Sequence, residues 1–261
     1  MRVQRGFSVV TGLAALVLIA GIGVAGWYVW QQKPQTQPAK NTKQAETQPP
    51  TNNQTISFAT PKKGAHFESS TPAHGSTLAA VPVDLVIDFN FDLADNSTIQ
   101  INRDGKDYGI GGTTVDNNKL ALRRQMDKNA PDGLYTVNYN GCWPDRTCHD
   151  GHFQFAVDRS LLNSYTDMRN QKTVSVKMSE TKFKPMNMRI SSGTTVTWIN
   201  DDNLEHYVNT DSHPAHSHVL ALNSKALKPG DNYSFTFTQT GSYPYHCSAH
   251  AANMTGNIVV E

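Results

Sequence analysis

The chain has 261 residues, which is enough for one large domain or two of ordinary size. Its 23 lysine and arginine residues nearly balance its 22 aspartate and glutamate residues, so no general attraction to nucleic acid is expected. The cysteine count of three is odd, so at least one thiol stays outside any disulfide within the chain.

The first expected element is an apolar helix. Residues 7–30, FSVVTGLAALVLIAGIGVAGWYVW, contain no charge and exceed the roughly 20 apolar residues that cross a bilayer core. They end in aromatic residues typical of a membrane interface. The alternative is a cleaved signal peptide, whose apolar core is usually about 7 to 15 residues long. We expect an uncleaved anchor, with residues 1–30 as a cytoplasmic stub and transmembrane helix.

Residues 31–56 are rich in Gln, Pro and Thr and almost free of apolar side chains. Such a composition cannot bury a core, so it predicts a disordered tether.

Alternating hydrophobicity then predicts a first β domain over residues 57–158. In VPVDLVIDFNFDL every second position is apolar, namely Val81, Val83, Leu85, Ile87, Phe89 and Phe91. Asp104-Gly105 is typical of a hairpin turn. DGLYTVNYNG and GHFQFAV supply two further alternating runs.

Residues 159–172 are polar and are expected to form either a short helix or a plain connector. A second β domain is predicted over residues 173–261. Its best strands are TVSVKM, TTVTWIN, NYSFTFTQ and GNIVVE, with turns at Ser192-Gly193 and Pro229-Gly230. The predicted fold class is therefore all-β: two β-sandwich (Greek-key) domains after a transmembrane helix and a disordered linker.

The last strand follows a short loop that carries metal donors. YPYHCSAHAANMTGNIVVE contains Cys247, His250 and Met254, and His206 can supply a fourth donor from the polar loop of WINDDNLEHYV. One thiolate, two imidazoles and a weak axial thioether form the ligand set of blue copper. His246 precedes the cysteine and points to the other face of an extended strand, so we predict that it is no ligand of this site.

Residues 173–261 resemble the plastocyanin-type cupredoxins. The resemblance rests on FKP (Phe183, Pro185), the Gly193 turn, Trp198, Asn200, Asp202, His206, KPGDNYSFTFTQTGSYPYHC and the final Cys, His, Met and Gly. It implies a type 1 copper with His206, Cys247 and His250 as equatorial ligands and Met254 as the axial one. It also implies one-electron transfer, with His250 as the route of the electron.

Three further histidines, His213, His216 and His218, follow the first of these ligands in NTDSHPAHSHVLAL. They form either a second, looser copper or zinc site or a solvated polar loop, and both interpretations stay open.

Cys142 and Cys148 flank WPDRT, close enough in sequence to form a small disulfide loop. This disulfide would leave Cys247 free as the metal thiolate. It would also indicate an oxidising compartment outside the cytoplasm. Two reduced core cysteines are the alternative.

Residues 64–158 resemble the CopC-like copper-resistance domain. The matching segments are AHFESSTPAHGSTL, VDLVIDFN and DGHFQFAV. The family's Cu(II) site implies Asp150 and His152 of the DGH motif as ligands. The family's first histidine falls on Gly64, and His66 lies two places later. This domain either binds a second copper or serves as a structural spacer.

We therefore expect a membrane-anchored type 1 copper protein that passes single electrons to a redox partner at the same membrane surface. The alternative is a copper-handling protein, for resistance or metal delivery, with a copper-trafficking partner. No enzyme is expected, because the sequence has only one H-x-H, at His216 and His218, and no evident catalytic triad. The N-terminus is expected in the cytoplasm and the domains in the periplasm or at the cell surface.

Overall fold

The computed structural model describes residues 56–261. The predicted anchor and nearly all of the predicted tether lie outside the described residues. Among residues 56–261, no helix has the length and apolar character needed to span a bilayer.

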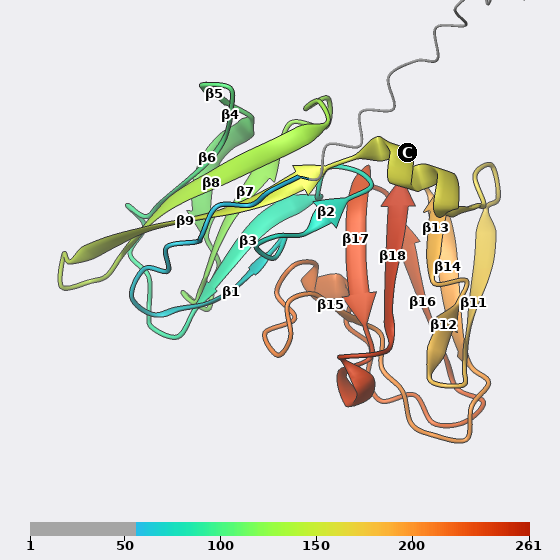
Figure 1. Ribbon diagram of the computed structural model, residues 1–261. Helices are drawn as coiled ribbons and strands as arrows, with labels where there is room; N and C mark the ends of the chain where they lie inside the picture. Colours follow the sequence, from blue (N-terminus) through green and yellow to red (C-terminus); the bar gives the residue numbers. More distant parts are fainter. Residues whose placement is uncertain (1–55) are drawn as a thin grey trace, which may run out of the picture. The chain divides into compact units, whose positions relative to one another are not determined.

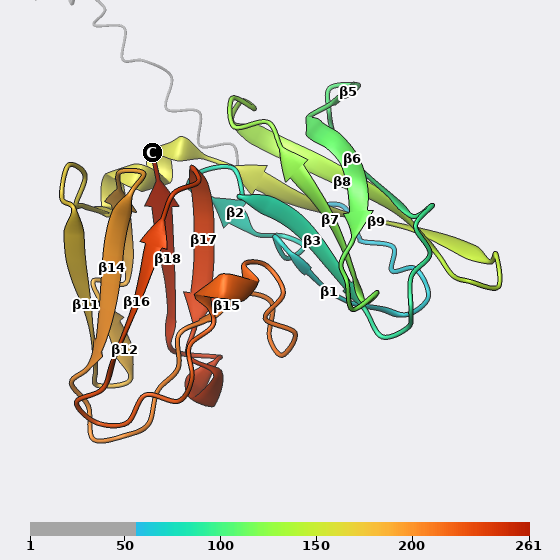
Figure 2. The same cartoon turned by 180° about the vertical axis from the view of Figure 1, so that it is seen from behind.

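The described chain is almost entirely β structure, as predicted (Figures 1 and 2). We call β1 to β9 the first sandwich and β10 to β18 the second sandwich. The only helical segments among residues 56–261 are three short 3-10 turns: η1 (Arg159–Ser164), η2 (Leu220–Leu222) and η3 (Ser248–His250).

Two sheets form the first sandwich. One has the order β1-β3-β7-β6, and the other has the order β2-β9-β8-β4-β5. The strands are β1 (Phe67–Thr71), β2 (Thr77–Leu78), β3 (Asp84–Phe89), β4 (Thr98–Arg103), β5 (Lys106–Asp107), β6 (Gly109–Val115), β7 (Ala121–Met126), β8 (Gly133–Cys142) and β9 (Cys148–Val157). Their inward side chains share one hydrophobic core, which includes Leu85, Phe89, Ile101, Tyr135 and Phe155.

The second sandwich also has two sheets, with the orders β10-β13-β18-β17-β15 and β12-β11-β14-β16. The strands are β10 (Thr166–Asp167), β11 (Thr173–Ser179), β12 (Lys182–Lys184), β13 (Asn187–Ile190), β14 (Thr194–Asn200), β15 (Asn209–Thr210), β16 (Asn232–Phe237), β17 (Gly241–His246) and β18 (Thr255–Val260). Their core is centred on Trp198, Phe237 and Tyr245 and extends to Cys247 and Met254.

The predicted turns form because their glycines adopt a left-handed backbone. Asp104 and Gly105 both have positive φ, 50° and 77°, as the two-residue hairpin between β4 and β5 requires. Gly193 and Gly230 also have positive φ, 89° and 84°. Both open interpretations of residues 159–172 hold in part, because this segment contains the turn η1 and then the two-residue strand β10.

Strand β3 departs from the predicted alternation. Leu85, Ile87 and Phe89 are buried as expected, but Val86 and Asp88 on the other face are buried too. The Asp88 carboxylate accepts hydrogen bonds from Ser69 and from Ser212 of the second sandwich, at 2.7 and 2.6 Å. Phe91, which the alternation groups with these buried residues, lies beyond the strand and is half exposed.

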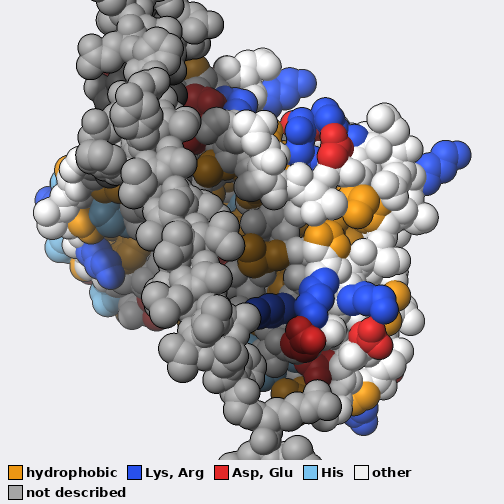
Figure 3. Space-filling model, turned by 45° about the vertical axis from the view of Figure 1, so that its right-hand side comes forward, with side chains coloured by type: hydrophobic (Ala, Val, Ile, Leu, Met, Phe, Trp, Pro, Cys, Tyr) orange, Lys and Arg blue, Asp and Glu red, His pale blue; other side chains and the backbone are white. Residues whose placement is uncertain are grey.

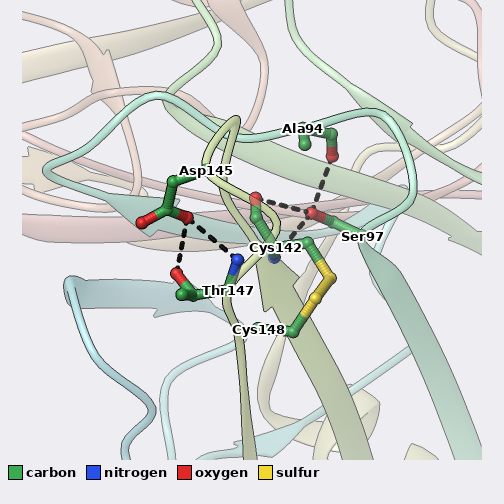
Figure 4. The surroundings of a disulfide bond; sticks show 6 residues. All are labelled: Ala94, Ser97, Cys142, Asp145, Thr147 and Cys148. Atoms are coloured by element: carbon green, nitrogen blue, oxygen red, sulfur yellow. Dashed lines mark hydrogen bonds between the residues drawn. A yellow bond between two sulfur atoms is a disulfide. The ribbon is translucent and has the colours of Figure 1, made fainter.

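Cys142 and Cys148 form a disulfide at the end of the β8–β9 hairpin (Figure 4). The Ser97 hydroxyl accepts a hydrogen bond from the Cys142 N–H at 3.0 Å and donates to the Ala94 carbonyl at 2.8 Å. Asp145 closes the tip by accepting from the Thr147 N–H and hydroxyl. The predicted disulfide is therefore confirmed, and Cys247 is the one free cysteine, which is buried.

Basic and acidic side chains lie next to one another on the face shown in Figure 3. Surface ion pairs of the second sandwich include Lys177 with Asp201 at 3.0 Å and Lys184 with Glu180 at 2.7 Å. Exposed pairs of this kind contribute little to stability, about 0 to 1 kcal/mol each.

Gly256 is required by close packing against the core. A Cβ atom at this position would lie 2.5 Å from the Tyr245 ring and 2.8 Å from the Met186 carbonyl oxygen. Tyr245 is fully buried against Trp198, so the ring has no free space to enter.

We predict that Gly256→Ala lowers the free energy of unfolding by about 1 to 3 kcal/mol, the usual cost of overpacking a core. Gly112→Ala is the control, because a Cβ atom there meets nothing within 4 Å. Urea unfolding followed by tryptophan fluorescence measures both. Equal stability of the two variants would contradict the packing argument.

Candidate metal centre

Three donor atoms from two distant segments converge at one end of the second sandwich. The Cys247 sulfur lies 3.6 Å from Nδ1 of His206 and 3.6 Å from Nδ1 of His250. A sulfur and a nitrogen bound tetrahedrally to one ion at ordinary bond lengths are about 3.5 to 3.6 Å apart. The three side chains therefore have the spacing of donors to a single metal ion, and their donor set suits copper.

The backbone holds Cys247 and Met254 side by side. The Cys247 N–H donates to the Met254 carbonyl at 2.9 Å, directly after the last pair of the β17–β18 ladder. The turn η3 between them brings the His250 ring back toward the sulfur. Met254 is completely buried in the same core as Cys247.

His206 is fixed from both sides of its ring and along its backbone. It exchanges two backbone hydrogen bonds with Leu227, at 3.0 and 2.8 Å. Its Nε2 lies 3.2 Å from the Asp202 carboxylate, which accepts a hydrogen bond from the Nε2–H and leaves the Nδ1 lone pair directed at Cys247. The backbone N–H of Thr181, then that of Asn203, and then the His206 ring lower the pKa of Asp202.

The Asn200 side chain holds the same loop through three hydrogen bonds. Its side-chain amide donates to the carbonyls of Leu204 and Leu227, at 2.7 and 2.8 Å, and its oxygen accepts from the Asp202 N–H. A second support reaches the sulfur itself, because the Tyr207 N–H points at the Cys247 sulfur from 3.3 Å.

A second histidine cluster lies beside the first and was not predicted in this form. His213 and His216, on the loop between β15 and η2, meet His246 at the end of β17. The sequence predicts that His246 is no ligand of the Cys247 site, as found, but it groups His218 rather than His246 with His213 and His216. Burial lowers the pKa of His216, and the neighbouring His246 and His213 lower it further.

His218 does not join that cluster. It is almost fully buried, and its Nε2 donates to the Asp84 carbonyl at 3.0 Å. Burial lowers its pKa to about 4, which keeps the ring neutral. The reason for the difference is backbone geometry, because the loop is not extended: His216 has a φ of +50°.

Arg123 of β7 anchors this loop to the first sandwich. Its guanidinium donates to the carbonyls of Ser217 and His218, at 2.7 and 2.8 Å, and forms ion pairs with Asp84 and Asp116. Burial raises the pKa of Asp84, and the charge of Arg123 opposes that rise.

The candidate copper residues of the first sandwich do not gather. His66 is hydrogen-bonded to Asn90 at 2.9 Å, and Asp150 is paired with Lys62 at 2.8 Å. His152 exchanges backbone hydrogen bonds with Lys62. Among residues 56–261, two groups of three potential metal ligands lie close together, and neither includes Asp150 or His152. The groups are His206 with Cys247 and His250, and His213 with His216 and His246.

Comparison with known proteins identifies the two sandwiches. A family model described as copper binding proteins, plastocyanin/azurin family, matches residues 170–261, and a CopC domain model matches residues 67–158. Plastocyanin of Scenedesmus fuscus is 34% identical over 84 residues, which are 30% of this chain and 86% of that protein. The chain belongs to the plastocyanin/azurin family. Both resemblances read from the sequence are confirmed, and copper is the metal of this chain.

Two further proteins are each similar to about a third of this chain. Amicyanin of Paracoccus denitrificans is 35% identical over 86 residues, which are 33% of this chain and 63% of amicyanin. A purple cupredoxin from Nitrosopumilus maritimus, known as a solved structure, is 28% identical over 34% of this chain and 99% of that chain, with a TM-score of 0.31.

We predict that Arg123→Met lowers the free energy of unfolding by about 3 kcal/mol, because Asp84 and Asp116 lose their partner while partly buried. Lys119→Met removes an exposed pair with Asp95 and is the control, with a change within about 1 kcal/mol. Thermal unfolding followed by circular dichroism compares them. If Lys119→Met were as destabilising as Arg123→Met, the contacts of Arg123 would contribute nothing specific to the stability of the fold.

Proposed function

We propose that the chain is a membrane-anchored type 1 copper protein that carries single electrons at the extracytoplasmic face. The observation that carries this proposal is the convergence of the Cys247 sulfur with the His206 and His250 nitrogens, each 3.6 Å away, in a buried setting. Met254, buried beside them, is the proposed axial ligand. Copper held by these residues would supply one-electron chemistry through its Cu(II) and Cu(I) states.

The protein's own contribution is to hold the donors still. Asp202 fixes the tautomer and angle of the His206 ring, and the pairing of Cys247 with Met254 fixes the loop. Cys247, Met254 and His206 are fully buried, whereas His250 is only partly buried. The His250 ring is therefore the part of the donor set nearest to solvent, and we assign it as the route of the electron to a partner.

The visible spectrum of the full chain, purified in detergent and loaded with Cu(II), tests the copper assignment. We expect an intense blue thiolate-to-copper band that Cys247→Ser abolishes. The double variant Cys142→Ser/Cys148→Ser is the control and should keep the band, because these residues lie in the first sandwich. A pale spectrum that Cys247→Ser leaves unchanged would refute the type 1 site.

Copper handling is the second candidate, and the CopC match at residues 67–158 favours it. Repeated chemical reduction and reoxidation of the copper-loaded chain in the presence of a Cu(I) chelator, followed by gel filtration, distinguishes the two functions. An electron carrier keeps its blue band and its copper through the cycles. A handling protein loses copper to a Cu(I) chelator once it is reduced.

Residues 7–30 carry the proposed anchoring. We expect the full chain, produced in a bacterium with a periplasm, to stay with the membranes after an alkaline wash and to be digested when protease is added to intact spheroplasts. A chain without residues 2–30 should be released by the wash. Protection of the full chain from the protease would contradict the extracytoplasmic placement.

A further inference from the structure

Three imidazoles meet beside the proposed type 1 site without sharing any of its residues. Nδ1 of His213 lies 3.3 Å from Nε2 of His216, and Nε2 of His246 lies 3.2 Å from the same atom. All three nitrogens lie within 4.8 Å of one another. Two nitrogens bound tetrahedrally to one ion at 2.0–2.1 Å are about 3.3 Å apart, so the spacing fits a shared metal.

Hydrogen bonding alone does not account for this arrangement. Nε2 of His216 faces three partners, because the Ser248 hydroxyl also lies 3.0 Å away. A ring nitrogen of neutral imidazole carries either one proton or one lone pair, so it satisfies only one such contact well. A cation between the rings would instead accept a lone pair from each of the three histidines.

The surroundings already set His246 in the tautomer that a metal requires. The Asp211 carboxylate accepts from Nδ1 of His246 at 2.9 Å, which leaves the Nε2 lone pair free and directed at His216. A carboxylate behind a ligating histidine is a recurrent feature of metal sites, where it fixes the ring and strengthens the donor. The His246 side chain is 3% exposed and the Asp211 side chain is 40% exposed, so the ring is shielded from water while the carboxylate behind it is not.

The loop that carries the other two rings is held in place by the backbone. The His216 N–H donates to the Ser212 carbonyl at 2.6 Å, and its carbonyl accepts from the Asn223 amide at 2.9 Å. His216 sits at a φ of +50°, a conformation costly for a histidine and common where a side chain must be placed for a function. Arg123 secures the following residues, as described above.

We propose that His213, His216 and His246 form a second metal site that binds one Cu(II) ion independently of Cys247. Three neutral imidazoles suit copper, which also binds such sites more tightly than the other first-row divalent ions. The exposure of the rings increases from His246 through His216 to His213, so the remaining coordination position faces solvent on the His213 side. A water molecule or a small anion would complete the site there.

Electron paramagnetic resonance of the full chain during titration with Cu(II) tests the site. We expect two signals: one that accompanies the blue band, and a second with the wide hyperfine splitting of copper bound without a thiolate. His213→Ala/His216→Asn should remove the second signal and keep the blue band. Asparagine is chosen because it tolerates the positive φ at position 216. The affinity for the second copper should fall more than about 100-fold, beyond the usual loss from an outer-shell change.

Two further variants distinguish the second site from the Cys247 site and from the DGH motif of the first sandwich. Cys247→Ser should lose the blue band and keep the second signal, so the failure of one site is visible apart from the failure of the other. His152→Ala, in the DGH motif of the first sandwich, should keep both signals. Loss of the second copper in His152→Ala, or its persistence in a folded His213→Ala/His216→Asn chain, overturns the proposal.

Discussion

The antiparallel pairing of β17 with β18 is the constraint on which both histidine clusters depend. Its last pair joins His246 to Thr255, and the next hydrogen bond joins Cys247 to Met254. Because neighbouring residues of an extended strand point to opposite faces, the His246 ring meets Asp211 and His216 while the Cys247 sulfur meets His206 and His250. One strand end therefore serves two sets of donors.

The main features of the fold and of the first donor set follow from local sequence. The strand segments of both sandwiches alternate visibly, and their turns contain glycines that the backbone requires. Cys247, His250 and Met254 lie within eight residues, so their convergence depends on one turn rather than on the whole fold. His206 is the one ligand of this set that is distant in sequence. Its position in a polar loop directly after an apolar strand indicates its role.

The second cluster could not be predicted in the same way, because its members meet through tertiary structure. The short pairing of β15 with β17 brings Asn209 opposite His246 and so delivers the 211–218 loop to that strand end. Spacing of two residues suggested that His216 and His218 share a face, which holds only for extended chain. The left-handed backbone at His216 breaks the extended geometry, and the His218 ring is hydrogen-bonded to the Asp84 carbonyl instead of facing His216.

The anchoring of this loop by Arg123 has a thermodynamic consequence. The guanidinium of the first sandwich holds the carbonyls that immediately follow His216. Coupling between two binding events is reciprocal. If the contact of Arg123 with the loop strengthens ion binding, a bound ion strengthens that contact by the same free energy. The first sandwich would then contribute to the affinity of the proposed second site without supplying a ligand, and an ion bound there would strengthen the contact of Arg123 with the loop.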